Sequence, residues 1–453
     1  CQDPPPVGGA EYSGVKGVLV QISSGTLYWQ GDSWQSSEKW LASSSTNNWN
    51  TWYYNISVST AFANGGSYQV KSKAYDVVGN TQTVAATHSF TYDNVEPSCS
   101  VTSPESGKSY SSFVNITGNA SDILSGIDYV EVQITSGTTT KTYWNGSDWT
   151  ISELWLPANG SWSYSSGPPK SKVGTGATYS VQCRATDKAG KQKLSSIVSF
   201  SGDVSPPDSQ VSEPQDGIPI GTPPTIKGTA SENGPGSINI VEVSIMREDN
   251  VYWDDSINNW GNPYEEHWNV TYSSTNYNYW VYQGTPTWSA NIEYTIKPRA
   301  KDNALPQGNV EVAVSSVTFQ YDPNGPTSLI TSPSQPYYKS LTLLSGTADD
   351  DGNEGSGLSE VKLRIADLSE NPVKYWKGTV IKWEAGEWWE MASGLEDWTY
   401  NKLTDNDWKN NHIYRINSRA RDYAGNYEIA FTTKTFTFDN AEPDSMISTP
   451  TAG

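Results

Sequence analysis

The sequence is poor in the residues on which catalysis, nucleic-acid binding and membrane insertion usually depend. It has only three histidines in 453 residues, His88, His267 and His412, and their unrelated positions argue against a histidine-based catalytic or metal centre. Lys and Arg number 29 against 49 Asp and Glu, a formal net charge of −20, which excludes a basic nucleic-acid-binding face. No apolar run approaches the roughly 18 residues that a membrane span needs.

What the sequence has instead is aromatic content and internal repetition. Twenty Trp and 27 Tyr are far too many for a disordered chain. A Phe-x-x-Asp or Phe-x-Phe-Asp element followed by Pro occurs four times, and the prolines, spaced by 110, 119 and 117 residues, are Pro97, Pro207, Pro326 and Pro443. The period predicts four repeats, each one structural unit.

Each repeat alternates apolar and polar residues in the manner of β-strands. A motif Tyr-x-[Val/Ile]-x-x-x-Ala-x-Asp leads into a Gly-containing turn in every repeat, starting at Tyr68, Tyr179, Tyr294 and Tyr414. No segment has a convincing helical pattern, so we predict an all-β fold of antiparallel β-sandwiches in tandem. The predicted boundaries are 1–95 for repeat 1, 96–205 for repeat 2, 206–324 for repeat 3, 325–441 for repeat 4, and a lone strand at 442–453.

A Tyr-Trp pair opens an aromatic segment in every repeat, and its tryptophans are Trp29, Trp144, Trp253 and Trp376. Recurrence in all four repeats favours an aromatic layer that packs the fold, since a Trp in a sandwich usually lies in the core or covers a sheet face. Glu384, Glu387 and Glu390 lie among three further tryptophans and offer a carboxylate pair for sugar hydrolysis. Because every repeat fills that place with aromatics, we favour packing and predict no enzymatic activity.

In order along each repeat, the motifs Gly-x-Ala-x-Asp, Val-x-Val-x-Ile, Tyr-Trp-x-Gly-x-x-Trp, Trp-x-Tyr, Ala-x-Asp-x-x-Gly-Asn and Phe-x-x-Asp-x-x-x-Pro resemble the bacterial Ig-like repeats of very long surface proteins. The resemblance covers essentially the whole chain. It implies Ig-like sandwiches and an extracellular or cell-surface stalk, adhesin or fibre, without a particular ligand. Two functions remain open: a structural array that self-associates, or an adhesin whose exposed Trp and Tyr bind surface glycans.

Two of the three cysteines are predicted to form a disulfide in repeat 2. Cys99 lies two residues before Val101 on the first strand, and Cys183 lies two residues after Val181, so both should face the core. At these two positions the other repeats carry Ser or Pro, so that cysteine occurs at both places in one repeat and at neither in the others. The alternative is two free buried thiols.

Carboxylates are predicted to gather at the junctions between repeats, because two loops of an Ig-like sandwich share the end at which the preceding module enters. The predicted groups are Asp93, Asp122 and Asp187 at the first junction, Asp203, Glu232 and Asp302 at the second, and Asp322, Asp422 and at least one of Asp349, Asp350 and Asp351 at the third. Such oxygen ligands suit Ca²⁺. The alternative is that they cap turns through their own backbone.

The last segment repeats the strand that opens each complete repeat, and repeat 1 lacks a counterpart because Cys1 to Pro6 leads almost directly into Gly9-Ala10. The strand residues are Asp444, Ser445, Met446, Ile447, Ser448 and Thr449. Donation of this strand to repeat 1 of another copy would pair the spare strand and complete the sandwich of repeat 1, and it would produce a head-to-tail homopolymer. Cys1 would lie near such a joint. The alternative is that the chain is a piece of a longer array, in which such ends arise from any cut.

Overall fold

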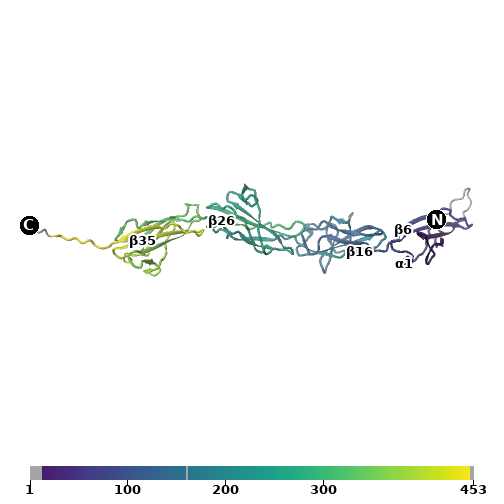
Figure 1. The fold of residues 1–453 in the computed structure, drawn as a ribbon, viewed down its shortest axis with the longest axis horizontal. Coiled ribbons are helices and arrows are strands. Elements are labelled where there is room, and N and C mark those ends of the chain that lie inside the picture. The colour runs from purple at the N-terminus through teal and green to yellow at the C-terminus, as the bar shows by residue number, and fades with distance from the viewer. Residues whose placement is uncertain (1–12, 160–161, 353, 449–453) are drawn as a thin grey trace, which may run out of the picture. The chain divides into compact units, whose positions relative to one another are not determined.

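The computed structural model describes residues 13–159, 162–352 and 354–448, and strands dominate every repeat (Figure 1). The one α-helix within these ranges, α1, has four residues, Val58–Ala61. Two short 3₁₀ turns span Lys170–Lys172 and Asp405–Asp407. No helix in the described part of the chain is long and apolar enough to cross a membrane. The predicted all-β fold of Ig-like antiparallel sandwiches is confirmed.

The chain divides into two compact units, Cys1–Val204 with Ala304–Gln307, and Ser205–Asn303 with Gly308–Gly453. The first unit contains the sheets of repeats 1 and 2, and the second contains those of repeats 3 and 4. Every sheet lies within one predicted repeat. The residue boundaries of the four repeats stay predictions.

Repeat 2 shows the complete arrangement of two facing sheets. Its strands are β7 (Ser98–Ser103), β8 (Ser109–Tyr110), β9 (Ile116–Ser121), β10 (Ile127–Ser136), β11 (Thr142–Trp144), β12 (Trp149–Thr150), β13 (Leu156–Pro157), β14 (Ser163–Tyr164), β15 (Thr178–Asp187), β16 (Gln192–Leu194) and β17 (Val198–Gly202). One sheet has the order β14-β9-β7. The other has the order β12-β11-β10-β15-β17-β8, with β13 on β10 and β16 on β15. The opening strand β7 packs across β15.

Repeats 3 and 4 follow the same plan. Repeat 3 contains β18 (Asp208–Glu213), β19 (Lys227–Ser231), β20 (Ile238–Arg247), β21 (Val251–Asp254), β22 (Asn259–Pro263), β23 (Asn269–Val270), β24 (Trp280–Val281), β25 (Ile292–Asp302) and β26 (Val317–Tyr321). Repeat 4 contains β27 (Thr327–Ser332), β28 (Tyr337–Tyr338), β29 (Leu344–Asp349), β30 (Leu358–Asp367), β31 (Lys374–Lys377), β32 (Lys382–Ala385), β33 (Glu390–Met391), β34 (Asp397–Tyr400), β35 (His412–Asp422) and β36 (Thr432–Phe438). Their opening strands, β18 and β27, pack across β25 and β35.

The described part of repeat 1 contains a single sheet, in contrast to the two of every other repeat. Its strands are β1 (Val15–Ser24), β2 (Leu27–Trp29), β3 (Trp34–Gln35), β4 (Leu41–Ala42), β5 (Ser67–Asp76) and β6 (Ala86–Thr91). The order is β3-β2-β1-β5-β6, with β4 on β1, so β5 corresponds to β15, β25 and β35. Cys1 and Gly9-Ala10, on which the prediction of a missing strand rests, lie outside the described residues.

The glycine of the Gly-x-Ala-x-Asp motif has a packing role. A Cβ on Gly346 would lie 1.9 Å from the Leu329 carbonyl oxygen and 2.1 Å from the ring of Trp398. Gly118 and Gly228 have the same environment against Trp162 and Trp280. The Trp-x-Tyr tryptophan therefore lies directly over the glycine of the neighbouring strand in the same sheet, and only glycine leaves room for its ring.

Candidate functional site

The tryptophans of the predicted aromatic layer lie in the core of each repeat. Trp29, Trp144, Trp253 and Trp376 are 3%, 2%, 0% and 0% exposed. Each packs against the second Trp of its hairpin at 5.4–5.6 Å between ring centroids, as in the T-shaped pairs of Trp144 with Trp149 and of Trp376 with Trp383. Rings enclosed in this way stabilise the fold and have no face free for a ligand.

A second row of tryptophans, which the sequence analysis missed, lies half-buried beneath cations. Each residue stands immediately before the short strand β4, β13, β23 or β33, and the pairs are Trp40 with Lys73, Trp155 with Arg184, Trp268 with Arg299 and Trp389 with Arg419, at 4.1, 4.6, 4.0 and 4.4 Å. Arg184 and Arg299 also pair with Glu131 and Glu242. Comparing the repeats position by position would have revealed the row, although not the cations above it.

The first junction brings its three predicted carboxylates together. One oxygen from each of Asp93, Asp122 and Asp187 lies within 4.8 Å of the others. Asp122 caps a turn by accepting from the backbone N–H groups of residues 124–126, at 2.8–3.0 Å. Asp187 is 1% exposed and its Oδ1 accepts from Lys191 N, but its Oδ2 has no hydrogen-bond partner. Turn capping therefore accounts for only part of this cluster.

Hydrogen bonds at the first junction favour the charged form of Asp93. The Ser125 hydroxyl, followed by the Val95 N–H, lowers the pKa of Asp93 below its usual range. Asp93 is only 5% exposed, so its charge has little contact with water. An ionised carboxylate beside a buried, unpartnered oxygen is an environment that attracts a cation.

The carboxylates of the third junction are more buried than those of the first, and they repel one another more strongly. Asp322, Asp350 and Asp422 are 0%, 4% and 1% exposed, and one oxygen of each lies within 4.8 Å of the others. Burial, followed by the charges of Asp322, Asp422 and Asp351, raises the pKa of Asp350 to about 6. Burial also raises the pKa of Asp422. Asp350 Oδ2 accepts from Gly357 N at 2.7 Å, whereas its Oδ1 has no partner.

Among the three neighbouring acids that the sequence offered at this junction, Asp350 is the one in the cluster. Asp349 accepts from Gly352 N, and Asp351 accepts from the Asn324 side chain at 2.7 Å. At the second junction, Asp203 belongs to the first compact unit, and Glu232 and Asp302 to the second. Within its own unit Asp302 accepts from the backbone and side chain of Asn309, and Glu232 accepts from Gly234 N.

The acids that suggested glycoside hydrolysis all have structural partners. Glu387 pairs with Arg364, and Glu384 pairs with Lys377 and Lys382. Glu390 is buried and accepts from Gly378 N at 2.9 Å and from the Tyr400 hydroxyl at 3.3 Å.

Another group, Asp367, Glu370 and His412, has the composition of a metal site. His412 Nδ1 lies 2.9 Å from Asp367, and Glu370 pairs with Lys374 and Lys409. Their partners within repeat 4 account for all three residues.

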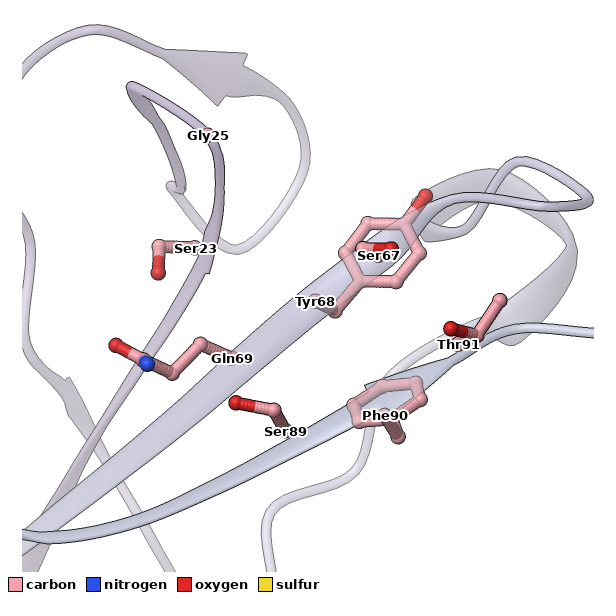
Figure 2. Close-up of a pocket in the computed structure, with 8 residues that line it drawn as sticks. All are labelled: Ser23, Gly25, Ser67, Tyr68, Gln69, Ser89, Phe90 and Thr91. Carbon is pink, nitrogen blue, oxygen red and sulfur yellow. The ribbon is translucent and has the colours of Figure 1, made fainter.

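A shallow hollow of about 490 Å³ lies at one end of the repeat 1 sheet (Figure 2). Ser23, Gln69 and Ser89 are cross-strand neighbours on its floor, and Tyr68 and Phe90 adjoin them. Its lining has hydroxyl and amide groups but no carboxylate, histidine or cation. This composition does not support catalysis.

The inward-facing residues of β5 are more exposed than the corresponding residues of β15 and β35. Val70, Ser72 and Ala74 are half-buried, whereas their counterparts on β35, Ile416, Ser418 and Ala420, are 0% exposed. On β15 the counterparts Val181, Cys183 and Ala185 are also 0% exposed. The opening strand packs across this strand in repeats 2, 3 and 4, whereas within residues 13–95 no strand covers the corresponding row of β5.

The predicted donor segment is extended and open to solvent. Asp444–Ser448 forms no strand in the structure, and Met446 and Ile447 are each 96% exposed. Thr449 lies outside the described residues. The segment thus leaves two adjacent large apolar side chains exposed to solvent.

The predicted disulfide partners meet as free thiols. Cys99 Sγ lies 3.3 Å from the Cys183 carbonyl oxygen, and Cys183 is 0% exposed. A hydrogen bond with the Cys183 side chain lowers the pKa of the Cys99 thiol to about 7. The structure thus brings the two residues together without a bond between them, and their pairing stays a prediction.

Comparison with known proteins agrees with this fold. The family model for a bacterial Ig domain matches residues 97–165. No curated protein sequence matches the chain. Among solved structures, the chain is similar to a tetra-tandem repeat in the extending region of a large adhesion protein, at 16% identity, 94% coverage of this chain, 92% of that chain and a TM-score of 0.33.

Two further solved structures have the same order of similarity. A structure of a 1.5-MDa bacterial ice-binding adhesin has 14% identity, with 77% of this chain and 99% of that chain covered and a TM-score of 0.32. Fibronectin(III)-like modules of Clostridium thermocellum CbhA have 14% identity, 50% and 94% coverage and a TM-score of 0.27. The chain is a tandem array of Ig-like sandwiches, and residues 97–165 match the bacterial Ig domain family.

Proposed function

We propose that this chain is an extracellular structural repeat protein that joins head to tail with further copies, the segment Asp444–Ser448 of one copy completing repeat 1 of the next. The observation that carries the proposal is the half-buried row Val70, Ser72 and Ala74 on β5, where the corresponding rows on β15 and β35 are fully covered. Burial of apolar surface and pairing of free backbone groups both favour addition of a strand there.

The donor segment has the inward pattern that this site requires. Ser445 and Ile447 align with Ser328 and Ile330 of β27, which are 2% and 4% exposed. Met446 aligns with Leu329, which faces outward and is 60% exposed. The segment therefore presents a small hydroxyl and a branched apolar side chain to the core and keeps Met446 toward water.

The acceptor has a matching polar group. In repeat 4, Glu428 accepts from Ala420 N and also from Ser328 N of the opening strand, at 3.1 and 3.0 Å. In repeat 1, Gln82 lies opposite Ala74 and accepts from Ala74 N at 3.2 Å. Gln82 thus offers the incoming Ser445 an amide where Glu428 offers Ser328 a carboxylate.

Covalent trapping tests the joint at a single pair of atoms. Ser328 Oγ and Ser418 Oγ are 2.7 Å apart in repeat 4, and the proposal gives Ser445 and Ser72 of two copies the same relation. With the native cysteines changed to serine, a chain carrying S445C mixed with one carrying S72C is expected to form a disulfide-linked dimer on a non-reducing gel. M446C, whose side chain faces outward, is the matched control. Equal yields from S445C and M446C, or no dimer from S445C, would contradict the proposal.

The junction carboxylates add a second part to the function, the binding of Ca²⁺ between successive repeats. Ca²⁺ takes oxygen ligands at about 2.3–2.6 Å, so ligands on opposite sides of the ion are up to about 5 Å apart. The oxygens of the first cluster and those of the third lie within 4.8 Å of one another, which is inside this limit. A cation would also give a partner to the buried Oδ2 of Asp187 and Oδ1 of Asp350. Bound in this way, it would stiffen the joints of a stalk.

Calcium is expected to raise the melting temperature of the chain by several degrees over the value in a chelator, because a ligand that binds only the folded state stabilises it by about 2.7 kcal/mol at 100 times its Kd. Asp350→Asn should remove the part of the shift that belongs to repeat 4. Asp349→Asn, which changes a neighbouring acid outside the cluster, should retain it. Identical calorimetric curves with calcium and with chelator would contradict calcium binding, and they would not bear on the proposed strand donation.

A further inference from the structure

A buried carboxylate fastens the opening strand in repeats 3 and 4. Ser328 N and Oγ donate to Glu428 at 3.0 and 2.5 Å, and Ala420 N on β35 donates to the same carboxylate at 3.1 Å. Glu428 is 6% exposed and Ser328 is 2% exposed. We call this arrangement, which links the opening strand to the long strand beneath it, the carboxylate clamp.

The carboxylate clamp of repeat 3 has the same members. Ser209 N and Oγ donate to Glu311 at 3.0 and 2.5 Å, and Ala300 N donates to it at 3.0 Å. Glu311 is 7% exposed. Hydrogen bonds to a charged acceptor are among the stronger ones, which makes the clamp a substantial part of how the opening strand is held.

Repeat 2 lacks the glutamate and the serine of this clamp. In repeats 3 and 4 the clamp glutamate, Glu311 or Glu428, lies opposite an alanine of the long strand. In repeat 2 the residue opposite the corresponding alanine, Ala185, is Lys193. Its ammonium group is exposed and pairs with Glu96 at 2.7 Å. The serine of the opening strand is replaced by Cys99. The opening strand β7 therefore needs another fastening.

The two cysteines occupy the places of a pair of serines that are in contact in repeat 4. Cys99 corresponds to Ser328 and Cys183 corresponds to Ser418, and the Oγ atoms of that serine pair are 2.7 Å apart. Cys99 Sγ lies 3.3 Å from the carbonyl oxygen of Cys183 itself. The backbone thus already holds the two side chains of repeat 2 in contact across the facing sheets.

We propose that Cys99 and Cys183 form a disulfide that fastens β7 to β15 in place of the carboxylate clamp, which makes repeat 2 the redox-sensitive member of the array. Cys99, the more accessible thiol, attacks a sulfur of a small-molecule or protein disulfide and releases one thiol. Cys183 then displaces the second thiol from the mixed disulfide. Two thiols are oxidised, one disulfide is reduced, and both protons leave on the released thiols.

The test uses the full chain refolded with oxidised and reduced glutathione, then alkylated in denaturant without reductant. We expect an intact mass two daltons below that of the reduced chain and one linked peptide pair that contains Cys99 and Cys183. Alkylation of both residues, or a link from either one to Cys1, would overturn the proposal.

Thermal unfolding tests whether the disulfide stabilises the attachment of β7 to β15. Reduction is expected to lower the melting temperature of repeat 2 by about 10 °C, because the bond closes a long loop. The double variant C99S/C183S gives repeat 2 the same serine pair that repeat 4 has, and it should melt at the same temperature with and without reductant. Loss of stability on reduction in both proteins, or in neither, would contradict this role of the bond.

Discussion

Trp144→Ala is expected to unfold repeat 2 while repeats 3 and 4 stay folded. Trp144 is 2% exposed, packs against Trp149 at 5.4 Å and donates from its indole N–H to the Ser166 carbonyl at 2.7 Å. Removing so large a buried ring costs about 3–5 kcal/mol, which is comparable with the whole stability of a small domain. Hydrogen exchange read by mass spectrometry should show loss of protection in β10 and β15 but not in β30 and β35.

Trp155→Ala is the matched control for this substitution. Trp155 belongs to the same repeat but is half-buried beneath Arg184, so its loss should cost only about 1 kcal/mol and leave β10 and β15 protected. The pair of variants also separates the structural function from glycan binding. A Trp144→Ala chain that keeps its fold and loses affinity for polysaccharide would favour the adhesin interpretation over ours.

The sequence was enough to predict those features in which a local pattern and the final environment agree. The alternation of apolar residues around Val130, Val132 and Ile134 predicts a strand with one buried face, and these residues are 5%, 0% and 1% exposed. The Tyr-Trp motif indicates packing because the same residues recur in every repeat, and all four tryptophans are buried. Loop positions in an Ig-like sandwich indicate where Asp93, Asp122 and Asp187 meet, although not which oxygen lacks a partner.

The carboxylate clamp was not predicted, and the reason is a difference in loop length. Glu428 follows Asp422 by six residues, whereas Glu311 follows Asp302 by nine, so the two glutamates do not align by spacing alone. Only the pairing of each glutamate with the opposite alanine shows that they are equivalent. The cations above Trp155 and Trp389 were not predicted for a related reason. They come from β15 and β35, which pair with β10 and β30 rather than with β13 and β33, so their position depends on the register of two strand pairings.

Removal of residues 440–453 is expected to abolish joining and leave monomers, because it takes away the strand that covers β5 of the next copy. Ile447→Asp should have the same effect within the full-length chain, since a charge at the inward position cannot enter the core of repeat 1 without a partner. Met446→Asp carries the same change one residue away, at the outward position, and should leave joining intact.

The most direct test of head-to-tail joining is electron microscopy of the purified chain, of its 440–453 deletion and of the Ile447→Asp and Met446→Asp variants, all at equal concentration. The account predicts extended filaments for the full chain and for Met446→Asp, and separate particles for the deletion and for Ile447→Asp. Filaments that persist after the deletion, or separate particles from the full chain, would contradict head-to-tail joining by this strand.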